Sequence, residues 1–218
     1  MTRGDGSKKR RLSDNDTSST GMSVEFMLSL QPILGCLEWA LRADAKDGGK
    51  WIRADDGARY RSLLEPLGKL LQARVPEEFP VVQASEGAQD PFLVFVVHGG
   101  GQHDSPGAVA DVGVGSVIGC LSALANAAGN EQLWKPLNHA VLEACSCTTA
   151  SEIRKGGLIC LLSLMKSLGE EYMVLLPECL PVLSELLEDT DELVANLAQD
   201  CITLGEELLG ESLEDNIR

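Results

Sequence analysis

Two stretches of this sequence repeat one pattern of apolar residues, prolines and glycines at a distance of 41 residues. In the later stretch, 172–210, leucines recur every three or four positions, an acidic turn follows, and a second apolar stripe comes after it. This spacing predicts two antiparallel helices. Shifting the stretch back by 41 residues aligns Pro177 with Pro136, Val182 with Val141, Leu183 with Leu142, Thr190 with Thr149, Val194 with Ile153, Cys201 with Cys160, Leu209 with Leu168 and Gly210 with Gly169.

A helical hairpin repeated at this period constrains the fold strongly. Its length lies in the range of HEAT and armadillo units, each of which is a set of packed helices. One hairpin cannot bury its apolar face alone, so neighbouring hairpins stack into a solenoid. The sequence therefore predicts an all-α fold, a HEAT-like α-solenoid of antiparallel hairpins. The structural positions that define its repeat are Pro136, Ile153, Pro177 and Val194.

The later hairpin carries the detailed expectations. The inner face of its first helix should consist of Leu176, Leu180, Leu183 and Leu187. Pro177 suits a first helical turn, and Pro181 predicts a kink or the true helix start. Asp189 and Glu192 have the spacing of a capping box, which predicts that a second helix begins at the turn. The inner face of that helix should consist of Val194, Leu197, Ala198, Cys201 and Leu208, and Gly205 marks a close contact.

Three further helices are predicted in the first part of the chain. Residues 22–45 should form an amphipathic helix, kinked at Pro32, with an inner face of Met27, Leu30, Leu34, Leu37 and Leu41. Residues 59–74 should form the next, with Tyr60, Leu63, Leu64, Leu67 and Leu71 inward. Core packing is the commoner role of such stripes, although membrane and partner faces carry them too. A helix over 109–128 should pair with 59–74 as an earlier hairpin, and 76–106 should be a surface loop inserted between them.

Composition and charge divide the chain into a tail and one repeat domain. Only 4% of the 218 residues are aromatic although 44% are apolar, which favours a core of aliphatic residues on helices. Residues 1–21 are polar and have no apolar periodicity, so they should be disordered, and 22–218 should form the HEAT-like domain. Within the tail, a basic cluster of the nuclear-import type consists of Lys8, Lys9, Arg10 and Arg11.

The net charge of −15 is concentrated at the other end. Residues 166–218 hold two basic and fourteen acidic side chains, a balance of −12, whereas 1–21 have a balance of +2. An acidic surface repels phosphate backbones, which argues against direct RNA binding by this half and favours basic protein partners.

No pattern of catalytic or metal-binding residues emerges. The seven cysteines include no CxxC pair, and the three histidines lack zinc spacing. The run "HGGG" at 98–101 resembles oxyanion-hole segments of esterases, but such enzymes also need a G-x-S-x-G nucleophile elbow. Ser116 has Val114 and Ile118 where the elbow requires glycines. We therefore expect no enzyme activity, no cofactor and no metal.

Three segments carry a more specific resemblance. They are "LWKPLNHAVLEAC" at 133–145, "EIRKGGLICLLSLMKSLGEEYMVLLPECLPVLSELLED" at 152–189, and "LGESL" at 209–213. Together they resemble the C-terminal domain of a family of very large HEAT-repeat proteins, the tenth U-three small nucleolar RNA-associated proteins, which are subunits of the small-subunit processome. The match is good over 131–213 and absent over 76–106. Members of that family are far longer than this chain.

The resemblance implies a function that the residues alone do not specify. It implies a scaffold in ribosome biogenesis, acting in nucleolar processing of small-subunit precursor rRNA and in small-subunit assembly. Its expected partners are other processome proteins, with the small nucleolar ribonucleoprotein and precursor rRNA contacted indirectly, and no membrane or small-molecule substrate. The expected location is the nucleus and nucleolus. The alternative from the fold alone is a generic HEAT-repeat adaptor for transport or phosphatase complexes.

Overall fold

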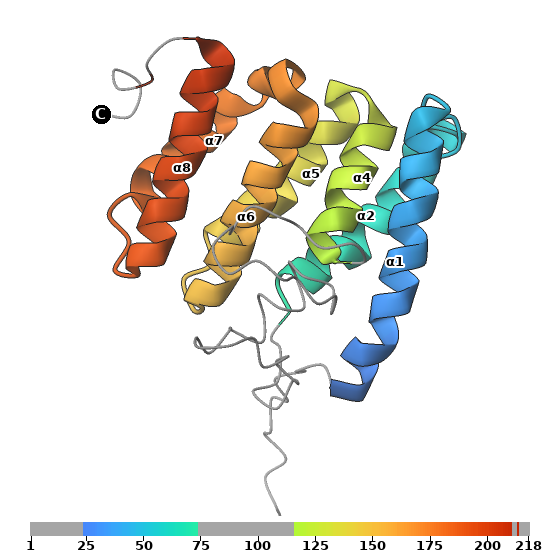
Figure 1. The fold of residues 1–218 in the computed structure, drawn as a ribbon, viewed down its shortest axis with the longest axis horizontal. Helices are drawn as coiled ribbons and strands as arrows, with labels where there is room; N and C mark the ends of the chain where they lie inside the picture. Colours follow the sequence, from blue (N-terminus) through green and yellow to red (C-terminus); the bar gives the residue numbers. More distant parts are fainter. Residues whose placement is uncertain (1–23, 74–115, 211–212, 214–218) are drawn as a thin grey trace, which may run out of the picture.

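The computed structural model describes residues 24–73, 116–210 and 213, and the described residues form helices and no strand. The predicted all-α fold is therefore confirmed. Its α-helices are α1 (Val24–Lys46), α2 (Ala58–Leu71), α4 (Val117–Ala128), α5 (Glu131–Cys145), α6 (Ser151–Leu168), α7 (Leu176–Leu186) and α8 (Glu192–Leu209) (Figure 1). Two short 3₁₀ helices are η1 (Asp55–Gly57) and η3 (Gly169–Val174). No helix in the described ranges is both long and apolar enough to cross a membrane.

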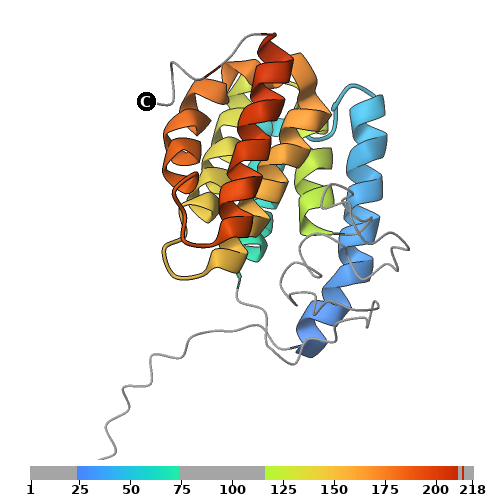
Figure 2. The same ribbon diagram turned by 60° about the vertical axis from the view of Figure 1, so that its left-hand side comes forward.

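The helices form two layers. One layer runs α1, α4, α6, α8 across the stack, and the other runs α2, α5, α7 behind it (Figures 1 and 2). One helix from each layer makes a hairpin, so the hairpins are α2 with α4, α5 with α6, and α7 with α8. The predicted pairing of the α2 segment with the helix that ends at Ala128 is confirmed, and α1 stands alone at the end of its layer. Residues 76–106 lie outside the described residues.

The repeat period is visible in the helix boundaries. α6 and α8 are each 18 residues long, and both their starts and their ends differ by 41 positions. Each ends at a glycine with positive φ, 55° at Gly169 and 73° at Gly210, a conformation that favours glycine over residues with a Cβ atom. The first helices of these two hairpins differ, because η3 and the shorter α7 replace the single helix α5. Pro177 occupies the first turn of α7 as expected.

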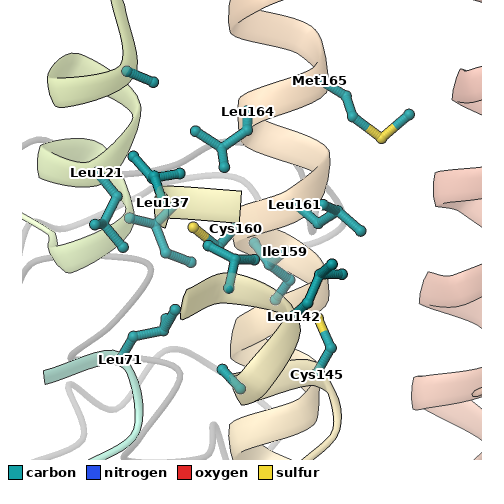
Figure 3. Packing of buried hydrophobic residues seen from close by; sticks show 14 of the residues in the cluster. Leu71, Leu121, Leu137, Leu142, Cys145, Ile159, Cys160, Leu161, Leu164 and Met165 are labelled. Carbon is teal, nitrogen blue, oxygen red and sulfur yellow. The ribbon is translucent and has the colours of Figure 1, made fainter. Parts of the chain in front are cut away.

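The core lies between the layers. Figure 3 shows Leu121 of α4, Leu137 of α5, and Cys160 and Leu164 of α6 meeting around one centre. α4 is buried on nearly all sides, because α1 and α6 flank it in its own layer and α2 covers it from the other. Small residues make this possible, since alanine, glycine and cysteine let neighbouring backbones approach closely. A helix that is apolar all round is expected in such a position.

α1 packs on the start of α4. The buried side of α1 consists of Met27, Leu34, Leu41 and the carboxylate-bearing Glu38. The Sγ of Cys120 donates to the carbonyl oxygen of Leu34 at 3.2 Å, and Gly119 leaves room for the Glu38 side chain. The predicted inner face is confirmed, with Leu30 and Leu37 half-buried at its edge. Pro32 lies inside the helix.

Helix ends and one helical face differ from the expectations. The N-cap of α8 is Asp191, whose Oδ1 accepts from the amide of Leu193 at 3.0 Å, so the predicted capping box at Asp189 is wrong. α4 begins at Val117 rather than near 109, because Ser116 caps it. Pro181 lies within α7 and does not start it. The buried face of α7 consists of Leu176, Cys179, Leu183 and Leu186, with Leu180 and Leu187 only half-buried. Capping and facing depend on neighbouring hairpins, which local spacing does not specify.

Candidate interaction surfaces

The residues singled out from sequence fall into two groups. The basic cluster, Lys8 to Arg11, lies outside the described residues. The four repeat-defining residues lie in the frame of the stack. Ile153 and Val194 are buried near the starts of α6 and α8, while Pro136 and Pro177 are exposed on the other layer. None of these four side chains forms part of a polar site.

The part of the chain that the structure describes contains no group of three or more histidine, cysteine or acidic side chains able to hold a metal ion. Ser116 is buried, and its Oγ accepts a hydrogen bond from the amide of Gly119 at 2.9 Å. Ser116 therefore caps helix α4 and is not placed as a nucleophile. Burial raises the pKa of the Cys120 thiol to about 12, so this thiol stays protonated and unreactive. Cys160 and Cys201 are buried core residues, as predicted.

Arg154 joins the turns of two successive hairpins. Its Nη1 donates to the carbonyl oxygen of Cys147 in the α5–α6 turn at 2.9 Å, and its Nη2 donates to Oδ1 of Asp189 in the α7–α8 turn at 2.9 Å. Its Nε lies 2.8 Å from Oδ2 of the same carboxylate, although the N–H is not aimed well enough to count as a hydrogen bond. Burial opposes ionisation of Asp189, but the hydrogen bond and charge of Arg154 outweigh it and lower the pKa of that carboxyl.

A second ion pair lies beside the first. The Nζ of Lys155 is 2.7 Å from Oδ2 of Asp191, and this hydrogen bond is the main reason that the pKa of Asp191 falls to about 2. The same carboxylate caps α8. The run "EIRK" therefore supplies two cations to the acidic turn of the next hairpin. The sequence analysis assigned this turn only a capping role. The basic pair Arg154–Lys155 and the acidic pair Asp189 and Asp191, at the same end of consecutive hairpins, could have predicted the ion pairs.

A buried polar cluster fixes the shorter helix α7. The hydroxyl of Tyr172 donates to Oδ1 of Asn138 at 2.5 Å and lies 3.2 Å from the Sγ of Cys179. All three side chains are buried, and they come from η3, α5 and α7. Burial raises the pKa of the Tyr172 hydroxyl well above its usual range, so it remains a donor. The cluster therefore joins η3, α5 and α7 through buried polar contacts.

The two ends of the stack expose different chemistry. The outer side of α8 exposes mainly polar residues, namely Glu192, Asn196, Gln199, Asp200, Thr203 and Glu207, alongside Leu193 and Leu209. The outer side of α1 exposes Leu28, Ile33 and Trp39, and Trp39 is 74% exposed. A terminal repeat normally carries a polar outer face. α8 meets that description and α1 does not, so the α1 end is the stronger candidate for a protein contact.

No family model matches the chain, but individual proteins do. Human HEAT repeat-containing protein 1 is 39% identical over 98 residues, which cover 45% of this chain and 4% of that protein. U3 small nucleolar RNA-associated protein 10 of Chaetomium globosum is 32% identical over 165 residues, which cover 76% of this chain and 9% of that protein. The protein of the same name from Pyricularia oryzae is 40% identical over 98 residues, 45% of this chain and 5% of that protein.

The two-layered stack with its 41-residue repeat defines the class as an α-solenoid of HEAT-like hairpins. Within that class, the chain is a homologue of HEAT repeat-containing protein 1 and U3 small nucleolar RNA-associated protein 10. The resemblance carried by the segments at 133–145 and 152–189 is thereby confirmed. The chain spans less than a tenth of the length of these relatives.

Proposed function

We propose that this chain is a non-catalytic scaffold in ribosome biogenesis, acting in nucleolar processing of small-subunit precursor rRNA and in assembly of the small subunit. The observation that carries the proposal is the similarity, over 76% of the chain, to a protein named for its association with the U3 small nucleolar RNA. An α-solenoid suits this role because it offers extended surfaces to several proteins at once.

The charge distribution supports protein partners rather than direct RNA contact. Residues 166–218 carry a balance of −12, and the described acidic side chains on the outer side of α8 face solvent. Such a surface repels RNA and attracts basic proteins. We therefore propose that other processome proteins bind the chain and that precursor rRNA and the small nucleolar ribonucleoprotein are held through them. Docking at the acidic end should weaken with salt, since exposed charges are screened over about 8–10 Å near physiological ionic strength.

The basic cluster Lys8–Arg11 is proposed to contribute to nuclear import. Replacing all four residues by alanine in a fluorescently tagged full chain should lower the nuclear-to-cytoplasmic ratio, because four positive charges are lost from one short segment. The control is replacement of the exposed Lys50, Lys69 and Lys135 by alanine on the folded domain. An unchanged ratio in the four-residue variant would remove this role from the cluster.

Affinity purification of the tagged full chain tests the proposal as a whole. Co-purified proteins and RNA should include small-subunit assembly factors and the U3 RNA. Nuclease treatment before purification should deplete the RNA and leave the directly bound proteins, because we expect protein contacts to be primary. Recovery of only transport or phosphatase components would refute the ribosomal role and support a generic adaptor. Loss of every protein after nuclease treatment would refute the indirect contact with RNA.

A further inference from the structure

The outer side of α1 has the sequence pattern of a helix-pairing seam. Counting along the helix in alternating steps of three and four gives Glu25, Leu28, Pro32, Gly35, Trp39, Arg42 and Lys46. At about 100° per residue, these positions lie roughly 120° around the helix from the buried Met27, Leu34 and Leu41, and all but Gly35 are exposed. Alternating steps of three and four keep a stripe on one side of a helix, which is how two helices bury a shared seam.

The charges of this seam are arranged for an antiparallel partner. Acidic Glu25 lies at one end and basic Lys46 at the other. In a parallel pair of identical helices, each end would meet its own charge. In an antiparallel pair centred between Gly35 and Cys36, Glu25 of each copy lies opposite Lys46 of the other. Opposite charges at both ends favour this orientation and disfavour the parallel one.

The same centre matches the apolar residues. With the centre between Gly35 and Cys36, two residues face each other when their residue numbers add up to 71. Pro32 of one copy then lies against Trp39 of the second, and Leu28 lies against Ala43 of the second. Gly35 and Cys36 then meet at the crossing point, where small side chains let two backbones approach. Trp39 supplies the large apolar anchor that commonly dominates an interface. Such a contact is isologous, because both copies contribute the same surface.

We propose that the outer side of α1 is a homotypic interface, in which a second copy of this chain packs its α1 antiparallel across the first. This surface is distinct from the acidic α8 end and lies at the opposite end of the stack (Figure 1). The proposal does not rest on the ribosomal role, since it is argued from the seam alone.

Charge reversal on the full chain tests both the contact and its orientation. Sedimentation equilibrium should show dimers of the parent chain. Glu25→Lys and Lys46→Glu should each weaken dimerisation by about five- to thirtyfold, because each reversal creates two repulsive contacts in the symmetric pair. The double variant Glu25→Lys/Lys46→Glu should recover the affinity of the parent chain. In a parallel pair each charge would face its own copy, so neither single reversal would weaken dimerisation. Single variants that dimerise like the parent, or a double variant that stays weak, would overturn the antiparallel arrangement.

Two further variants test the apolar centre. Trp39→Glu should keep the chain monomeric even at a concentration about a hundredfold above the one at which the parent chain dimerises. Leu193→Glu, at the opposite end of the stack, is the matched control and should leave dimerisation unchanged. Circular dichroism should show both variants folded, since both side chains are more than half exposed. A short bifunctional thiol reagent should link the two copies through Cys36, and Cys36→Ser should prevent it.

A parent chain that remains monomeric throughout would overturn the proposal and indicate that another segment or another protein covers this side of α1. If dimers persist in Trp39→Glu and are lost in Leu193→Glu, the interface lies on α8, and the proposal is equally overturned.

Discussion

Replacement of one glycine offers the sharpest check on the packing of α5 against α6. A Cβ atom at Gly157 would lie 2.7 Å from the backbone nitrogen of Cys145, 2.9 Å from its Sγ and 3.1 Å from the carbonyl carbon of Ala144. Two of these three atoms belong to the backbone of α5, which a side-chain rotation cannot move away. Gly157→Ala should therefore force the two helices apart.

The net effect of Gly157→Ala is a difference of two opposing contributions. Alanine in a helix interior is favoured over glycine by about 1 kcal/mol. Overpacking a close-packed contact typically costs about 1–3 kcal/mol, and a contact with backbone belongs at or above the upper end. The variant should be about 2 kcal/mol less stable than the parent chain. For a chain of this size, that corresponds to a melting temperature lower by roughly 4–8 °C.

The matched control is Gly68→Ala in α2. Gly68 is also buried in a helix, but a Cβ there would lie 3.6 Å from the Cβ of Ala140, an ordinary van der Waals contact. The helix preference should then act alone and stabilise the chain by about 0.5–1 kcal/mol. Urea unfolding of both variants, followed by circular dichroism, measures the difference. If Gly157→Ala stabilises the chain as much as Gly68→Ala does, the close approach of α6 to α5 is wrong.

Two further predictions concern the last hairpin. Val194→Asp should lower the free energy of unfolding by about 3–5 kcal/mol, because it places an unpaired charge in the core. Leu193→Asp, at the exposed neighbouring position, should change the free energy of unfolding by less than about 0.5 kcal/mol. Equal melting temperatures for the two variants would refute the repeat alignment. Since the pKa of Asp191 falls from 3.8 to about 2, mainly through the hydrogen bond from Lys155, the folded chain binds that proton less readily than the unfolded chain does. The resulting stabilisation, about 1 kcal/mol after solvent screening, is complete above roughly pH 4 and lost as the pH falls towards 2. Lys155→Met should flatten this acid dependence in urea unfolding measured at each pH, and an unchanged dependence would show that the pair contributes nothing.

Much of the fold could be predicted because a repeat is encoded in local spacing. The 41-residue shift aligned Ile153 with Val194, and the structure buries both near the starts of helices of equal length. Gly169 and Gly210 mark the two helix ends, because both have a positive φ, which glycine adopts most easily. Periodicity likewise identified the buried side of α1.

What could not be predicted depends on which hairpin lies next to which. Asp189 is a residue type that often caps helices, and it lies three positions before a glutamate. Its carboxylate nevertheless accepts a hydrogen bond from Arg154, 35 positions earlier in the chain. Asp191 caps the helix instead. The facing of α7 is shifted by the Tyr172 cluster, which draws Cys179 inward. Helical spacing identified the buried side of α1 but did not identify Leu28, Ile33 and Trp39 as exposed apolar residues of that helix.

The position of Arg154 has a consequence for how the stack opens. A helical repeat at the end of a solenoid usually frays independently, since only one neighbour holds it. Here, detaching α7 and α8 would separate Arg154, whose side chain is only 14% exposed, from the Asp189 carboxylate. Because solvent screens such a pair less than an exposed one, separating it costs more than separating an ordinary surface ion pair. Arg154 therefore couples the last two hairpins, and we expect their amide hydrogens to exchange together rather than in succession from the C-terminal end.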